Sequence, residues 1–234
     1  NGQSDPIILD ILIGERIAPH KRDKLDALKD ASIRVSAHER PLQVLFSRTK
    51  TRDQLKDGEK EVRALRQSTD DTALVGYESL ARELLDIPDL RAVFIGTSSG
   101  TTADALARFF KKASADNSSK QIEIHIVQTT SCHPIADAFN EDIVTGNDSE
   151  VSIADAIVDH TSFRKTKLVP LIEATGGSGW IATNESISTA IDLTRMHTGL
   201  LISPNSALSV AGLMNATLTG RTWDGAVACM ICGD

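Results

Sequence analysis

The sequence predicts an α/β fold with a mainly parallel, twisted sheet and flanking helices, similar to a Rossmann fold. Apolar runs of strand length alternate with helix-like segments through most of the 234 residues. The clearest example is Ala92–Ile95, an apolar run followed by a turn rich in Gly, Ser and Thr and then by apolar residues at helical spacing. A second uncharged run, residues 226–231, has the composition of a strand buried on both faces.

The first third of the chain predicts a strand at residues 6–13, a helix at 21–29 and a short strand at 33–35. Residues 47–72 are rich in charge, which is typical of a solvated helix and crossover segment. Residues 76–85 follow as an amphipathic helix.

The middle of the chain predicts a strand at 92–95, a helix at 101–112 and a strand at 122–127. Residues 150–175 carry one or two helices, and Pro170 is expected to interrupt them because proline has no N–H to donate.

The last part predicts a strand at 180–182, a helix at 184–196 capped by Asn184, a helix at 206–218 and a strand at 226–231. The domain boundary is expected near residues 38–48 or 66–75.

Composition excludes several classes of function. A net charge of −7 with no stripe of Lys or Arg argues against a nucleic-acid groove. No uncharged stretch approaches the roughly 20 residues that span a membrane, and Asn1–Pro6 lacks the features of a signal peptide. Three sparse cysteines, Cys132, Cys229 and Cys232, fit a reducing cytoplasm. The six histidines are scattered without ligand spacing, so we expect no metal site.

The turn Gly96–Thr102 is the strongest candidate for a ligand site. A strand that enters a helix through such a turn directs backbone N–H groups and the positive end of the helix dipole at one place, which suits a phosphate. The hydroxyls of Ser98, Ser99, Thr101 and Thr102 are further possible donors. The alternative is an ordinary strand–turn–helix junction with a Ser or Thr cap. The spacing of Gly96 and Gly100 does not match the dinucleotide-binding fingerprint.

The order and spacing of several motifs resemble the fold-type II pyridoxal-phosphate enzymes, the group of threonine synthase, cysteine synthase, threonine dehydratase and tryptophan synthase β. Gly96–Thr102 is similar to the glycine-rich loop that holds the cofactor phosphate in that family, and Gly76–Leu84 is similar to the helix before it. Further matching segments, at about the expected distances, are residues 152–155, 176–179, 183–187, 197–208 and 227–233. The match covers roughly residues 5–234.

The resemblance implies pyridoxal 5′-phosphate as cofactor, with its phosphate at Gly96, Thr97, Ser98, Ser99, Gly100 and Thr101. It also implies that Cys232 lies near the pyridine nitrogen, where a thiol leaves that nitrogen unprotonated. The alternative for Cys232 is a small buried residue at the end of a strand. Ser206 is expected at the N-cap or in the first turn of a helix.

The family's reactive lysine belongs to a Ser-x-Lys-x-Arg-like segment, and a Ser-x-Gly-Asn loop follows it. Neither segment occurs in this sequence, and Lys50 bears only a superficial likeness. We therefore assign no catalytic residue and expect this chain to be inactive alone. It resembles the later two thirds of such an enzyme. The resemblance implies three parts: a remnant of a small α/β domain at 1–40, a crossover segment at 41–75 and a large α/β domain that binds the cofactor phosphate at 76–234.

Two functions stay open at this point. The first is the C-terminal portion of a pyridoxal-phosphate lyase or synthase that acts on a hydroxy-amino acid or its activated ester by β- or γ-elimination or replacement. The second is a non-catalytic α/β module that binds a phosphorylated small molecule. We expect an amino-acid substrate, no nucleic-acid or membrane partner, and a homodimer or pairing with a missing N-terminal segment.

Overall fold

A computed structural model describes residues 7–49, 61–115, 121–139 and 151–232 of the chain. The chain forms two compact units, residues 1–65 and 66–234. The domain limits expected at residues 40 and 75 stay a prediction. No helix in the described ranges has the length and apolar character needed to cross a membrane.

The first unit contains a parallel pair of strands. β1 (Leu9–Gly14) pairs with β2 (Ile33–His38), and α1 (Pro19–Asp26) connects them. These elements follow the predicted strand, helix and strand. α2 (Pro41–Arg48) begins with a proline in its first turn and was not predicted. Within the charge-rich stretch at residues 47–72, residues 50–60 lie outside the described residues.

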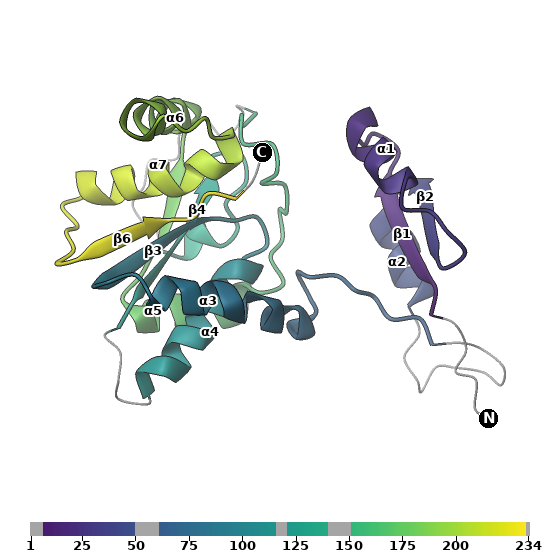
Figure 1. Cartoon of the computed structure of the whole chain (residues 1–234), viewed down its shortest axis with the longest axis horizontal. Helices are drawn as coiled ribbons and strands as arrows, with labels where there is room; N and C mark the ends of the chain where they lie inside the picture. Colours follow the sequence, from purple (N-terminus) through teal and green to yellow (C-terminus); the bar gives the residue numbers. More distant parts are fainter. Residues whose placement is uncertain (1–6, 50–60, 116–120, 140–150, 233–234) are drawn as a thin grey trace. The chain divides into compact units, whose positions relative to one another are not determined.

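In the second unit, the described residues form a four-stranded parallel sheet in the order β5-β4-β3-β6. Its strands are β3 (Leu90–Gly96), β4 (Glu123–Thr129), β5 (Gly179–Ala182) and β6 (Ala226–Cys229). The chain starts the sheet at β3 and adds β4 and β5 on one side, then returns to place β6 on the other side of β3 (Figure 1). The direction in which successive strands are added therefore reverses at β3, between its neighbours β4 and β6. Open α/β sheets bind ligands at such a point, in the crevice at the carboxyl ends of the strands.

Helices cover both faces of this sheet (Figure 1). One face packs against α4 (Thr101–Ala115) and α5 (Lys165–Thr175), and α3 (Glu78–Leu85) packs on α4. The other face packs against α7 (Pro204–Leu218), and α6 (Asn184–Thr198) packs on α7. Two short 3₁₀ helices, η2 (Asp71–Tyr77) and η3 (Ala136–Phe139), complete the described elements. This three-layer arrangement confirms the predicted fold class.

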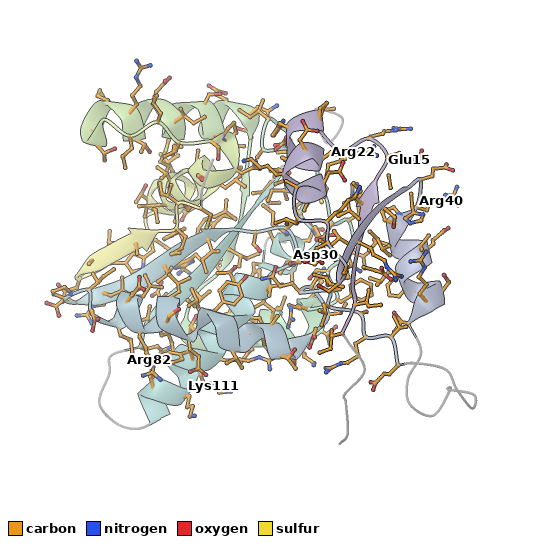
Figure 2. The ribbon with its side chains drawn as sticks, turned by 45° about the vertical axis from the view of Figure 1, so that its right-hand side comes forward. Glu15, Arg22, Asp30, Arg40, Arg82 and Lys111 are labelled. Carbon is orange, nitrogen blue, oxygen red and sulfur yellow. The ribbon has the colours of Figure 1, made fainter. Side chains whose placement is uncertain are left out.

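The layers follow from the alternation of side chains along the strands. Val93 and Ile95 of β3 face the α4 side, whereas Ala92 and Phe94 face the α7 side. All four side chains are almost fully buried, as expected for a parallel strand covered on both faces. Arg82 on α3 and Lys111 on α4 are exposed, and they lie on the outer side of these helices (Figure 2).

Two expected helix boundaries are wrong. Pro170 does not interrupt a helix, because α5 runs continuously through it and is held by the fully buried Leu168 and Ile172. The cap of α6 is Thr183 and not Asn184, since the extended Thr183 accepts a hydrogen bond from the Ser186 amide.

A buried imidazole lies on the α7 side of the sheet. His125 of β4 is completely buried and stacks on Phe94, with ring centroids 4.4 Å apart. Its Nδ1 accepts from the Ser178 amide at 3.1 Å and from Trp180 Nε1 at 3.2 Å, so Nε2 carries the hydrogen and donates to Glu123 Oε2 at 2.9 Å. Burial lowers the pKa of His125 to about 4, although the hydrogen bond to Glu123 opposes this shift.

Acid should destabilise the second unit through His125. The unfolded imidazole gains its proton near pH 6.5, whereas the folded one stays neutral until about pH 4. The free energy of unfolding should therefore fall by up to about 3 kcal/mol between pH 6.5 and 4. Urea unfolding of the wild type and His125→Gln across this range measures the difference, and His197→Gln, at an exposed position of α6, is the control. Equal pH dependence in wild type and His125→Gln would contradict the assignment.

Candidate phosphate site at the carboxyl edge of the sheet

A tight turn joins β3 to α4. Gly100 has a φ of +84°, and its amide donates to Thr97 Oγ1 at 2.9 Å. The Gly100 carbonyl accepts from the Asp104 amide, which is the first hydrogen bond of the helix, so Gly100 is the N-cap of α4. The predicted sequence of strand, turn and helix is confirmed at residues 90–115.

Four backbone amides of this turn are free to bind an anion. Within the described residues, the amide N–H groups of Ser98, Ser99, Thr101 and Thr102 have no acceptor. Two of them belong to the first turn of α4, a helix of 15 residues whose dipole places positive charge there. Adjacent unpaired amides and a helix N-terminus together form a site that suits a phosphate.

Two glycines allow the close packing around the turn. A Cβ on Gly96 would lie 2.8 Å from Leu208 Cβ and 3.1 Å from Asn205 O, so the first turn of α7 lies directly against the end of β3. A Cβ on Gly100 would lie 2.5 Å from Leu168 Cδ2 and 2.9 Å from Ile135 Cδ1. Packing against α7 and α5 therefore requires these glycines, independently of any ligand.

The structure brings Cys232 to the same edge of the sheet as Gly96. β6 is parallel to β3 with Phe94 opposite Cys229, and the Met230 amide donates to Phe94 O at 2.9 Å. The exposed Cys232 lies two residues after Met230, and Ser206 Oγ in the first turn of α7 donates to its carbonyl at 2.9 Å. Binding of the cofactor by Cys232 stays a prediction, as it does for the residues of the turn.

Cys229, three residues earlier, differs from Cys232. It is partly buried, and its thiol lies 3.7 Å from Ser209 O. Burial raises the pKa of Cys229 to about 11, so this thiol stays protonated at neutral pH. A group of His, Cys, Asp or Glu side chains that could hold a metal ion is not found among the described residues.

Segment 157–162 covers the turn and was not predicted as part of the site. Ser98 Oγ accepts from the amides of Val158 at 3.2 Å and Asp159 at 3.0 Å, and it donates to Asp159 Oδ2 at 3.1 Å. Ser162 Oγ donates to Ser99 O at 2.9 Å. Ser98 and Asp159 are 61 residues apart in the sequence, so no local sequence pattern could predict their contact.

Most hydroxyls of the turn bind groups of the protein itself. Ser98 binds Asp159, Thr97 accepts from Gly100, and Ser99 Oγ lies 3.0 Å from Thr101 Oγ1. In this conformation the backbone amides are therefore the principal donors available to an anion, and the hydroxyls shape the turn.

A buried ion pair supports the helix that follows the turn. Arg164 is 3% exposed and lies 2.7 Å from the fully buried Asp104 in the first turn of α4. Asp104 also accepts from Arg108 Nε at 2.6 Å, and this hydrogen bond raises the pKa of Arg108. Arg164 donates to Asp71 as well, which lowers the pKa of that carboxyl. Sequence analysis missed this network because its members come from distant segments.

The position of a reactive lysine stays a prediction. Lys50, which resembles the family lysine only superficially, lies outside the described residues. Lys111 lies ten residues along α4 from Thr101, about 15 Å from the turn by helix geometry, and points outward (Figure 2). Lys167 forms an ion pair with Asp71 at 3.6 Å.

The sheet is parallel and covered on both faces, and the turn with unpaired amides lies where the direction of strand addition reverses. This architecture defines an α/β protein of the doubly wound class, in which ligands bind at the carboxyl edge of the sheet. Residues 10–233 match the family model described as "Pyridoxal-phosphate dependent enzyme". The chain belongs to this family, and the family binds pyridoxal phosphate.

Solved structures show the same fold. The processed form of threonine deaminase isoform 2 from Solanum lycopersicum aligns with a TM-score of 0.66 at 16% identity, over 97% of this chain and 62% of that one. Serine racemase from Dictyostelium discoideum aligns with a TM-score of 0.67 at 13% identity, over 97% of this chain and 68% of that one. The O-acetylserine-dependent cystathionine β-synthase from Helicobacter pylori aligns with a TM-score of 0.59 at 15% identity, over 94% of this chain and 64% of that one.

This chain thus spans less than two thirds of two of these three structures. A search of curated protein sequences found no significant match. The names deaminase, racemase and synthase describe those proteins, and the similarity establishes only the shared fold for this chain.

Gly100→Ala should destabilise the protein more than the same change at Gly199. Both glycines have a positive φ, which costs alanine about 1 kcal/mol or more. Only at Gly100 does the new methyl group also overlap buried side chains, which adds about 1–3 kcal/mol. Chemical unfolding of both variants measures the difference, and equal losses would contradict the close packing of the turn.

Proposed function

We propose that this chain carries the cofactor-phosphate portion of a pyridoxal-phosphate lyase or synthase. Its reaction would be β- or γ-elimination or replacement on a hydroxy-amino acid or its activated ester, similar to threonine synthase or cysteine synthase. The observation that carries the proposal is the set of unpaired amides between Ser98 and Thr102, at the reversal of strand order. The family match supports it.

The residues present fit the phosphate end of the cofactor. The amides of Ser98, Ser99, Thr101 and Thr102 would hold the phosphate oxygens, and the dipole of α4 would favour their negative charge. When bound, pyridoxal phosphate supplies an electron sink for the carbanion formed at the amino-acid Cα. The protein contributes position and electrostatics.

We further propose that Cys232 faces the ring end of the cofactor. Its position beside the turn supports this, because β6 and β3 are neighbours and end at the same edge. A thiol is a weak hydrogen-bond donor that carries no charge when protonated, so it would leave a pyridine nitrogen neutral. A neutral ring suits elimination and replacement as the resemblance implies.

The second candidate function is a non-catalytic module that binds a phosphorylated small molecule. The absence of a Ser-x-Lys-x-Arg-like segment from this sequence favours it. Both candidates share the phosphate site, and they differ in whether an amine of this chain reacts with the cofactor aldehyde.

The proposed phosphate site is tested by removing the backbone N–H of one residue, Thr102, while keeping a side chain of similar size. Thr102→Pro deletes an N–H in the first turn of α4, where proline is tolerated, and should weaken binding of inorganic phosphate at least tenfold. Thr102→Val keeps the amide and loses only the hydroxyl, so it should bind within about twofold of wild type. Isothermal titration calorimetry measures both, and thermal unfolding reports whether each variant is folded. Similar affinity in Thr102→Pro and wild type would overturn the proposal.

Borohydride reduction separates the two candidate functions. We expect pyridoxal phosphate to bind this chain reversibly, in competition with inorganic phosphate, and to leave no stoichiometric adduct after reduction, because no lysine here lies in a matching motif. Mass spectrometry of peptides from the reduced protein identifies any modified lysine. One fully modified lysine, with Lys50 the first to examine, would show that this chain supplies the reactive amine itself.

A further inference from the structure

Gln128 of β4 contacts the turn at Gly96–Thr102 from the interior of the domain and has no exposed surface. Its Nε2 donates to Ser98 O at 3.1 Å and to Thr97 O at 3.3 Å. Its Oε1 accepts from the amides of Ile135 at 2.8 Å and Ala136 at 2.9 Å. The side-chain amide thus uses both hydrogens and both lone pairs.

These four contacts determine which way the amide group faces. The reverse orientation would place N–H groups against the amides of Ile135 and Ala136, and an oxygen against the carbonyls of Thr97 and Ser98. Gln128 therefore holds two successive carbonyls of the turn toward the body of the domain.

Fixing a carbonyl also fixes the next amide. In a trans peptide the N–H points opposite to the C=O of the same plane, and the structure has no cis peptide among its described residues. When Thr97 O and Ser98 O point at Gln128, the amides of Ser98 and Ser99 point away from it. These are two of the four amides without an acceptor in the described part of the chain.

We propose that Gln128 is a positioning residue that aims the Ser98 and Ser99 amides at a tetrahedral dianion bound in the turn. This inference rests on the proposed phosphate site. Gln128 touches the protein and not the ligand, so it acts through the orientation of two peptide planes. The helix amides of Thr101 and Thr102 need no such support, because α4 itself orients them.

An uncharged amide suits position 128 because it can donate and accept hydrogen bonds at the same time. A glutamate at residue 128 could still accept from Ile135 and Ala136 with one oxygen. Its second oxygen would face the carbonyls of Thr97 and Ser98, and would need a proton to donate to either of them. When ionised, that oxygen would repel both carbonyls and turn the two peptide planes.

Gln128→Glu consequently gives a test that depends on pH. Sulfate is the probe because it remains a dianion across the range used. Wild type should bind sulfate with less than threefold change between pH 5.5 and 8.5, apart from effects that the control shares. Gln128→Glu should lose at least tenfold in affinity over the same range as the new carboxyl ionises. Gln121→Glu is the matched control, since Gln121 is exposed and, within the described residues, donates to Ala174 O at the other end of β4 from the turn.

The amide proton resonances of Ser98 and Ser99 supply an independent readout. Sulfate should shift both in wild type and in Gln128→Glu at pH 5.5, but not in Gln128→Glu at pH 8.5. If Gln128→Glu does not fold, Gln128→Met removes the amide and should weaken sulfate binding at least tenfold while the thermal unfolding midpoint confirms a folded protein.

The outcomes separate the two proposals. If wild type binds sulfate and Gln128→Glu binds it equally at both pH values, the role of Gln128 is refuted and the phosphate site stands. An affinity loss of equal size at both pH values, with a lowered unfolding midpoint, also refutes it, because a merely structural role predicts that result. If wild type binds neither sulfate nor pyridoxal phosphate, both proposals fail.

Discussion

The pairing of β3 with β6 is the constraint on which the candidate site depends. Because these strands are adjacent and parallel, the turn after β3 and the residues after β6 emerge at one edge of the sheet. Gly96 lets α7 approach the end of β3, and the first turn of α7 in turn binds the carbonyl of Cys232 through Ser206. Packing between backbone elements, rather than any ligand, therefore brings the turn and Cys232 together.

Contacts from three distant segments hold the turn in shape. Gln128 donates to two carbonyls of the turn from the interior of the domain, and segment 157–162 contacts the turn at Ser98 and Ser99. Arg164 pairs with Asp104 in the first turn of α4, which follows. Arg164 and Asp104 are buried, and loss of either partner would leave an uncompensated charge at a cost of several kcal/mol. For the anion site proposed above, these contacts would keep the unpaired amides oriented before binding, which would lower the free-energy cost of binding.

Much of the fold was predictable because strand and helix signals are local. The apolar run at 92–95, the turn and the helical spacing after residue 101 predict β3, its turn and α4, and the structure confirms them. The uninterrupted α5 was not predictable, because burial of Leu168 and Ile172 offsets the hydrogen bond lost at Pro170. The Thr183 cap was missed because the backbone conformation, not residue type alone, selects between adjacent capping residues.

The sequence by itself determined the alternation of strands and helices, the Gly- and Ser-rich turn at residues 96–102 and the motif order that resembles the pyridoxal-phosphate enzymes. These are properties of short segments, set by side-chain periodicity and backbone freedom. Only the tertiary structure decided that Ser98 binds Asp159 and that Gln128 reaches the carbonyls of the turn. Those contacts join residues 30 or more positions apart, and hydrogen-bond partners at such separations are chosen by how the layers pack.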